Sequence, residues 1–283
     1  MTVFEAFNNT KQQLLAIYDN NEATAIANGL AEVYTNTQKT DREIRQKLVL
    51  NKEQQEKWNK ATKRLLKYEP LQYVINEAWF YGLKFYVDEN VLIPRPETEE
   101  LVDWIVKEHA RADNNLHILD IGTGSGCIPI SLKKVLPNAT VFAIDLSESA
   151  IAVAQKNAAL LQAAVEFISI DFLSENATKY LPNYDIIVSN PPYIPQKDAL
   201  QMEANVLKYE PKMALFVPDN NPIVFYKAIA FFGKQHLNPG GYIYLELYDV
   251  YHKEVIDFYK EQGYQTNIKE DMQGKQRMLK ATL

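Results

Sequence analysis

Cysteine is nearly absent from this sequence of 283 residues, in which Cys127 is the single example. One thiol supplies neither an intramolecular disulfide nor a thiolate cluster, and the four histidines show no metal-ligand spacing. No metal site is therefore expected. The sequence also lacks a basic start followed by an apolar segment, and it has no apolar run of membrane-spanning length. We expect a cytoplasmic protein without a membrane partner.

An excess of basic residues is missing too, since 30 Lys and Arg stand against 36 Asp and Glu. Residues 1–75 hold 11 basic and 9 acidic side chains, whereas the remainder holds 19 and 27, so the acidic character lies in the larger part. Proteins whose main task is to bind nucleic-acid phosphates normally present a basic domain. A nucleic acid is therefore not expected as the substrate.

The first part of the chain has the apolar spacing of helices. Apolar residues recur at helical intervals around Leu14 to Tyr18 and around Ile44 to Val49, between polar stretches. From Trp79 the pattern changes to two short aromatic segments on either side of Gly82, which predicts a β-hairpin. We expect a helical bundle over residues 1–75 that recognises the substrate, and a hairpin linker over residues 76–93.

The third region, residues 94–283, has the alternation of an α/β fold. A helix is expected after Pro96, because acidic residues fill its first turn. Apolar segments of strand length then alternate with amphipathic helices. Strands are expected at 118–121, 141–144, 165–168, 186–189, 242–247, 264–268 and 276–281, and helices at 128–135, 148–161, 222–236 and 250–262. This rhythm predicts a mostly parallel, seven-stranded sheet covered on both faces.

A glycine-rich loop follows the first of these strands and precedes a helix, where a doubly wound sheet offers its ligand crevice. Its residues are Gly122, Thr123, Gly124, Ser125 and Gly126. Glycines allow a sharp turn and a close approach of ligand to backbone. Asp145 ends the next strand, where a carboxylate can accept both ribose hydroxyls of a nucleoside. These two features favour a nucleoside cofactor but leave NAD open.

Two further strand ends carry polar or aromatic residues. Asp171 and Phe172 follow the third strand, where a carboxylate can accept the adenine amino group and a flat ring can lie along the base. The fourth strand runs into a motif at the same edge of the sheet as the glycine loop. That motif is Asn190, Pro191, Pro192 and Tyr193.

The chemistry of this motif suits methyl transfer to a planar nitrogen. An amide nitrogen is a poor nucleophile, so it must be held in line with the methyl donor. The Asn190 side-chain oxygen and the Pro191 carbonyl can each accept one hydrogen of an NH2 group, and proline fixes this carbonyl outward. Tyr193 offers a ring face to the planar group. A methyltransferase that uses S-adenosyl-L-methionine is therefore predicted.

From about Pro70 onward the sequence resembles the glutamine N5-methyltransferases of peptide chain release factors, the HemK-like family. The matching segments are Pro70 to Tyr73, Phe80 to Gly82, Leu92 to Glu99, Asp120 to Gly126, Asn190 to Tyr193, Tyr209 to Pro211, Ala214-Leu215, Asp271, Gly274 and Arg277. The resemblance implies a small helical domain, a β-hairpin linker and a Rossmann-like methyltransferase domain. It also implies that the glutamine of a Gly-Gly-Gln motif is the acceptor.

The same resemblance implies roles at matching positions. Gly122 to Gly126, Asp145, Phe172 and Asn190 would hold the cofactor, and Asn190 to Tyr193 would hold the glutamine. Asn76 and Leu247-Tyr248 depart from the family, which commonly has glycine at the corresponding places.

Three alternatives to a release factor enzyme remain open: a glutamine methyltransferase for a ribosomal protein, a nucleic-acid amino-methyltransferase, and a catalytically silent cofactor-binding module. We expect a monomer.

Overall fold

The structure is a computed structural model that describes residues 1–109 and 115–283. Residue contacts divide the chain into two compact units. The helical unit comprises residues 1–77 and 203–209, and the sheet unit comprises residues 78–202 and 210–283. Among the described residues, no helix is both long enough and apolar enough to cross a membrane.

The helical unit confirms that the first part of the chain forms helices. They are α1 (Val3–Leu14), α2 (Asn20–Thr35), α3 (Arg42–Lys47), α4 (Lys52–Leu65) and α5 (Leu71–Ile75). Capping boxes start α1 and α4, because Thr2 and Asn51 each exchange hydrogen bonds with the residue three positions later. The core contains Leu30 and Trp58, and the Trp58 indole donates a hydrogen bond to the Thr10 hydroxyl (2.8 Å).

One helix of this unit comes from much later in the sequence. It is α10 (Ala204–Tyr209). The Tyr209 hydroxyl donates a hydrogen bond of 2.7 Å to the Lys67 carbonyl, at the end of the N-terminal segment. The chain thus leaves the sheet unit after Met202 and returns to it at Glu210. Apolar spacing gave no indication of this excursion.

The predicted hairpin is present. It pairs β1 (Ala78–Phe80) with β2 (Leu83–Phe85) through Tyr81 and Gly82, both of which have positive φ, as the favoured two-residue hairpin turn requires. Phe80 and Phe85 are fully buried in a core cluster of the sheet unit. Just before the hairpin, Asn76 ends α5 with a φ of 55°, in the left-handed region. Asparagine tolerates this conformation better than most residues, which accounts for a glycine position occupied by asparagine.

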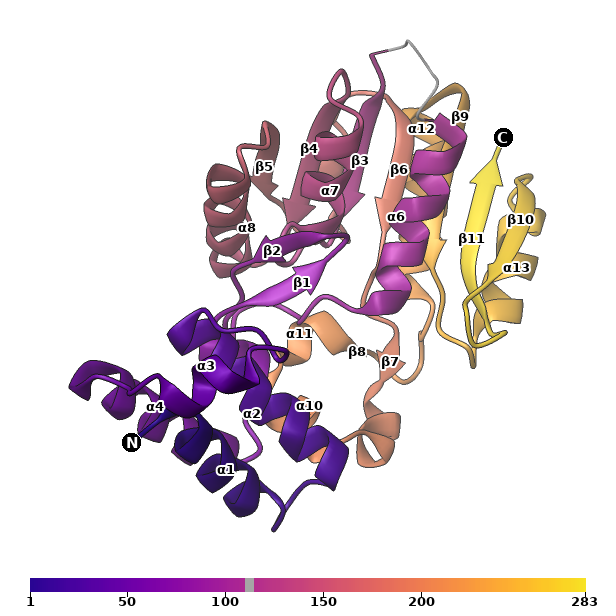
Figure 1. Ribbon diagram of the computed structural model, residues 1–283. Coiled ribbons are helices and arrows are strands. Elements are labelled where there is room, and N and C mark those ends of the chain that lie inside the picture. Colours follow the sequence, from indigo (N-terminus) through magenta and orange to yellow (C-terminus); the bar gives the residue numbers. More distant parts are fainter. Residues whose placement is uncertain (110–114) are drawn as a thin grey trace. The chain divides into compact units, whose positions relative to one another are not determined.

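The predicted seven-stranded, mostly parallel sheet is confirmed (Figure 1). Its strands are β3 (His117–Ile121), β4 (Thr140–Asp145), β5 (Val165–Ser169), β6 (Tyr184–Ser189), β9 (Leu237–Glu246), β10 (Gln265–Glu270) and β11 (Gln276–Thr282). Their spatial order is β10-β11-β9-β6-β3-β4-β5. Within the described sheet β11 alone is antiparallel to both of its neighbours.

Helices cover both faces of this sheet. They are α6 (Pro96–His109), α7 (Cys127–Val135), α8 (Glu148–Leu161), α12 (Val224–His236) and α13 (His252–Glu261). Buried residues of α6, α7 and α8 share one core cluster with Ile118 and Ile186, whereas α12 and α13 share another with Leu119 and Ile187. Alternate residues of each strand thus face opposite helix layers, as a parallel sheet buried on both sides requires. In Figure 1, α6 and α7 lie in front of the strands.

The sequence missed several short elements. They are α9 (Glu175–Thr178), β7 (Ile194–Pro195), η1 (Gln196–Gln201), α11 (Lys212–Leu215) and β8 (Phe216–Val217). None is long enough to show an apolar period. β9 also begins five residues before the predicted strand at Tyr242. Leu237 pairs with Tyr184 across a register shift, which the intervening Pro239-Gly240-Gly241 segment accommodates with a positive φ at Gly240.

Candidate functional site

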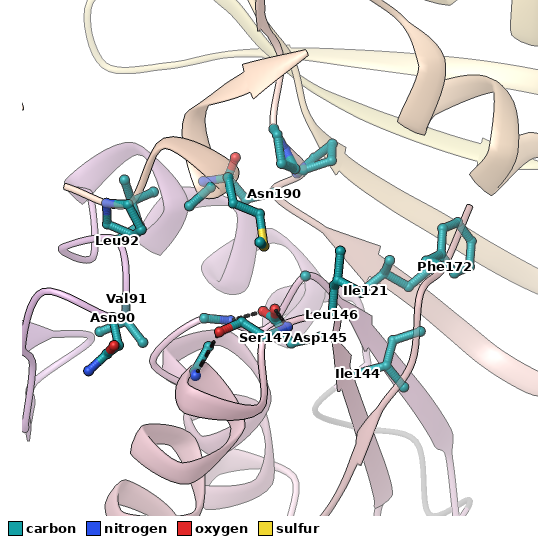
Figure 2. A pocket seen from close by; sticks show the side chains of 18 of the residues that line it. Asn90, Val91, Leu92, Ile121, Ile144, Asp145, Leu146, Ser147, Phe172 and Asn190 are labelled. Carbon is teal, nitrogen blue, oxygen red and sulfur yellow. Dashed lines mark hydrogen bonds between the residues drawn. The ribbon is translucent and has the colours of Figure 1, made fainter. Parts of the chain in front are cut away.

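A pocket of about 350 Å³ lies at the carboxyl ends of β3, β4 and β6. The chain order reverses here, because β4 and β5 continue on one side of β3 and β6 lies on the other. Such a switch point leaves a crevice beyond the strand ends. Eight residues that the sequence singled out line this pocket: Gly122, Gly124, Asp145, Asp171, Phe172, Asn190, Pro191 and Pro192. Figure 2 shows Asn190 above Asp145, with Phe172 to the side.

Four other residues that the sequence singled out do not line the pocket. Thr123 and Ser125 are buried within the loop, with exposed fractions of 4% and 2%. Gly126 precedes α7 with a φ of 79°, and a Cβ there would stand 3.1 Å from the Ala154 Cβ. A glycine is therefore required at position 126 so that the loop can pack closely on α8, and not so that a ligand can approach the backbone. The fourth residue, Tyr193, stands beside the pocket-lining prolines.

Two loop glycines do leave room for a ligand. Gly122 and Gly124 have φ values of 76° and 53°, and a Cβ at either would meet no described atom within 4 Å. The Gly122 and Thr123 amides donate hydrogen bonds to the Ile144 carbonyl at the end of β4. This pairing holds the loop against the neighbouring strand while its glycine faces stay open to the pocket.

Asp145 is anchored by backbone amides. Its Oδ2 accepts from the Gly124 N–H and its Oδ1 from the Ser147 N–H, both at 2.9 Å. Burial raises the pKa of Asp145, and these backbone hydrogen bonds offset part of that rise. Each carboxylate oxygen retains acceptor capacity, because an ionised oxygen carries more lone pairs than one amide uses. Asp145 can therefore accept hydrogen bonds from a ligand in the pocket.

A second acid at this loop was not among the predicted site residues. Asp120, the next-to-last residue of β3, is fully buried, and neither of its carboxyl oxygens has a hydrogen-bond partner among the described residues. Burial raises its pKa to about 7, and the nearby Thr123 hydroxyl offsets part of the rise. A buried carboxyl without a hydrogen-bond partner lowers the stability of the fold, so its presence here calls for a functional explanation. Its place as a polar residue inside an apolar strand was the available signal.

Asp171 and Phe172 play different structural parts. Phe172 is buried, and its ring packs edge to face against that of Phe232 with 5.4 Å between the ring centroids. Asp171 is exposed and accepts a hydrogen bond from the Leu173 N–H at 3.0 Å. Both line the pocket, so an apolar ring and a solvated carboxylate adjoin the same space.

Asn190 is placed by the end of β6 and oriented by α6. The Ser189 hydroxyl donates to the Ile121 carbonyl (2.7 Å), which holds the ends of β6 and β3 together. The Asn190 Nδ2 donates to the Thr98 Oγ1 at 3.0 Å. The Thr98 hydroxyl in turn donates to the Glu246 Oε2 at 2.6 Å, at the end of β9. With its NH2 group engaged, Asn190 keeps its side-chain oxygen available as an acceptor.

Tyr193 is held on two sides. Its hydroxyl donates to the Glu246 Oε1 at 3.5 Å. Its ring stacks on that of Tyr248, with 5.2 Å between the ring centroids and an interplanar angle of 13°. Burial and the nearby Glu246 carboxyl raise the pKa of Tyr193 above its usual range. One ring face is thus covered by Tyr248, a residue at which the sequence departs from the family that it resembles. Thr98, Glu246 and Tyr248 were not predicted as site residues from their chemistry.

An ion pair joins two further segments that contribute residues to the pocket lining. Arg95 contacts Glu210 through Nη2 at 2.6 and 2.8 Å, and the Ile93 N–H donates to the same carboxylate. Residues 89–92, which precede Arg95 in the sequence, and Pro211, which follows Glu210, line the pocket. Glu210 is 4% exposed, and Arg95 is the cationic side chain that pairs with its carboxylate. Chemistry alone gave no sign of this pair, and both residues lie in segments noted by resemblance.

Comparison with known proteins gives two family matches. Residues 99–212 match the methyltransferase small domain, and residues 5–75 match the PrmC N-terminal domain. The release factor glutamine methyltransferase of Flavobacterium psychrophilum is 42% identical, over 95% of each chain. That of Bacteroides thetaiotaomicron is 49% identical, over 77% of each chain. Among solved structures, a methyltransferase from Pyrococcus furiosus has a TM-score of 0.50 at 20% identity, over 82% of this chain and 98% of that one, which shows a shared fold.

Proposed function

This chain belongs to the release factor glutamine methyltransferase family, and from that premise we propose that it methylates the side-chain amide nitrogen (N5) of a glutamine in peptide chain release factors. The acceptor would be the glutamine of a Gly-Gly-Gln motif, and the methyl donor S-adenosyl-L-methionine. One observation carries the proposal most directly. The amide of Asn190 presents an oxygen acceptor at the same pocket as the open glycines Gly122 and Gly124.

The pocket residues fit this cofactor. The two open glycines leave a cradle that side chains would fill, and Asp145 has acceptor capacity for ribose hydroxyls. Phe172 and Asp171 provide an apolar ring and a carboxylate for the base. The unpartnered Asp120 carboxylate offers negative charge beside the loop, which suits a ligand that carries an ammonium and a sulfonium. A cavity of about 350 Å³ is in the range of small-molecule sites.

When bound, the cofactor supplies an electrophilic methyl group on a sulfonium. The residues of this chain would then position the nitrogen that receives it. The Asn190 oxygen and the Pro191 carbonyl accept the two amide hydrogens, and no described residue donates to that carbonyl. A strong base is not required, since the methylated nitrogen becomes very acidic and loses its proton readily. Tyr193 would help to hold the glutamine with the ring face that Tyr248 leaves uncovered. Its hydroxyl, which donates to Glu246, holds the ring in place.

The test is a labelling experiment with competing acceptors. The protein is incubated with methyl-labelled S-adenosylmethionine, a release factor, a ribosomal preparation and DNA, and the label is located by mass spectrometry. We expect the label on the release factor glutamine. Label on a ribosomal protein or on DNA would reject the release factor as substrate, and cofactor binding without transfer to any acceptor would indicate a catalytically silent module.

We also propose that the helical unit recognises the release factor. It holds no part of the pocket, and it exposes the apolar side chains of Phe4 and Val49, with exposed fractions of 43% and 63%. Binding energy from remote parts of a substrate supports orientation at the reacting centre. Serine at both positions should therefore lower kcat/KM for an intact release factor more than for a short Gly-Gly-Gln peptide.

Truncation is a poorer test of this idea, because α10 packs within the helical unit and would lose its partners. The matched control is Leu160→Ser, which removes a 64% exposed leucine from α8 in the sheet unit. Equal losses for the intact factor and the peptide in the double serine variant would assign the helical unit a supporting role instead.

A further inference from the structure

Three polar groups, two of them buried, form a chain of hydrogen bonds beside the pocket. The Thr98 hydroxyl accepts from the Asn190 Nδ2 at 3.0 Å and donates to the Glu246 Oε2 at 2.6 Å. Thr98 and Glu246 are each only 2% exposed, so water does not compete for the contact between them. The groups come from the start of α6, the end of β6 and the end of β9.

The direction of this chain follows from what each group can donate. An ionised carboxylate is an acceptor only, so Thr98 must spend its single hydroxyl hydrogen on Glu246. Its oxygen can then only accept from Asn190. An amide that must donate to Thr98 points its NH2 group toward α6 and its oxygen away from it.

From this geometry we propose that Thr98 and Glu246 are positioning residues that fix the orientation of the Asn190 amide, so that its oxygen and not its NH2 group meets the acceptor nitrogen. The inference rests on the proposed function, because only an incoming NH2 group makes the distinction matter. A reversed amide would set a donor against a donor. It would leave the hydrogen of the reacting nitrogen without a partner, at the cost of a hydrogen bond.

Glu246 has a second donor, which ties the motif together. Its other oxygen, Oε1, accepts from the Tyr193 hydroxyl at 3.5 Å. One carboxylate therefore faces the first and last residues of the motif, through Thr98 in one case and directly in the other. Both contacts require Glu246 as an acceptor.

Protonation of Glu246 would remove this control. Burial raises its pKa to about 7. The groups that face it from neighbouring elements are Thr98 and Glu97 from α6, Tyr193, Arg277 from β11 and Tyr226 from α12. A protonated Glu246 can donate to the Thr98 oxygen, which frees the threonine hydrogen to donate to the Asn190 oxygen. Control of the amide should thus be strong above pH 8 and weak below pH 6.

The test compares Thr98→Val, which keeps the shape of the side chain but loses the hydroxyl, with Thr98→Ser, which keeps the hydroxyl. Turnover of an intact release factor is measured at saturating cofactor from pH 5 to pH 9, and the cofactor Kd is measured by calorimetry. The matched control is Thr266→Val in β10, where the hydroxyl has no partner among the described residues. Glu246→Gln is a second variant that removes the ionisable group.

We expect Thr98→Val to lower kcat about tenfold above pH 8, the effect of one hydrogen bond, with the cofactor Kd unchanged. Thr98→Ser should stay within about threefold of wild type by the same measure, because its hydroxyl makes both hydrogen bonds, and Thr266→Val should match wild type. The ratio of wild-type to Thr98→Val turnover should shrink below pH 6, and Glu246→Gln should flatten the pH dependence.

Two results would overturn the inference in an active enzyme: a ratio that stays constant over the whole pH range, or a loss in Thr98→Ser as large as in Thr98→Val. A constant ratio would mean that ionisation of Glu246 does not control the amide, and an equal loss in Thr98→Ser would mean that Thr98 acts by packing. A wild-type protein that methylates no release factor would overturn the proposed function itself, which the wild-type arm reports separately.

Discussion

Replacing Asp145 by asparagine tests the cofactor pocket at a single atom. The carboxylate accepts from two backbone amides, of Gly124 and Ser147, through different oxygens. Asparagine keeps one acceptor oxygen but puts an NH2 group where the other oxygen was. It therefore loses one backbone contact and half of the acceptor capacity that faces the pocket.

The expected effect can be scaled from the hydrogen bonds concerned. A hydrogen bond to a charged group contributes roughly 1.5–3 kcal/mol, so losing one ribose contact should cost about 2 kcal/mol of binding free energy. This corresponds to a cofactor Kd about 30 times higher, since each 1.4 kcal/mol is tenfold. Asp145→Ala should weaken binding further, because both oxygens are lost. Turnover at saturating cofactor should change little, because Asp145 does not hold the acceptor nitrogen.

Calorimetric titration with S-adenosylmethionine measures this change, and the chain offers a matched control. Asp185, near the start of β6, also accepts two hydrogen bonds, from the His117 N–H at 2.7 Å and the Asn238 Nδ2 at 2.8 Å. It lies near the opposite end of the strand from Asn190. Asp185→Asn should lower stability without changing the cofactor Kd. A Kd for Asp145→Asn equal to that of the control would refute the assignment of Asp145 to the ribose.

Three further predictions follow from the same geometry. Asn190→Ala should lower kcat a hundredfold or more, about 3 kcal/mol in the barrier, with cofactor affinity largely kept; near-normal methylation would exclude its role in holding the acceptor. Asn157→Ala should lower the free energy of unfolding by about 3 kcal/mol in urea titrations. The buried Asn157 amide accepts a hydrogen bond from the Tyr86 N–H and donates to the Tyr86 and Ser125 carbonyls, and the variant loses all three. An unchanged midpoint would contradict this. Asp120→Asn should stabilise the ligand-free protein at pH 8 by up to about 4 kcal/mol, and should not stabilise it near pH 4. The pKa of Asp120, about 7, lies above that of an unfolded aspartate, so ionisation of this carboxyl lowers the stability of the folded protein as pH rises from 4 to 7. Equal gains at both pH values would exclude this carboxyl as the cause.

The part of the site that the sequence predicted is the part that sheet topology brings together. Gly122, Asp145 and Asn190 each follow a predicted strand, and carboxyl ends of neighbouring parallel strands meet at one edge. Recognising the strands was therefore enough to predict that these residues share a pocket. Their roles toward cofactor and substrate stay predictions.

The rest of the site depends on contacts between segments that no local pattern links. Thr98 and Glu246 are 148 residues apart, and Arg95 and Glu210 are 115 apart. A buried hydrogen bond or ion pair of this kind leaves no periodic signal in either segment. The stacking of Tyr248 on Tyr193 is another such contact, and it alters the expected use of the tyrosine ring.

Three acids near the pocket show how partners divide the work of one functional group. Asp145 receives one backbone amide on each oxygen and keeps lone pairs for a ligand, whereas Asp120 has no described partner and suits a positive charge. Glu246 receives a hydroxyl on each oxygen, from Thr98 and Tyr193. Glu246 does not line the pocket, so its carboxylate serves these two hydroxyls and does not meet a ligand there. This arrangement suits a carboxylate that orients other groups, and it agrees with a reaction in which the nitrogen loses its proton only after it has been methylated.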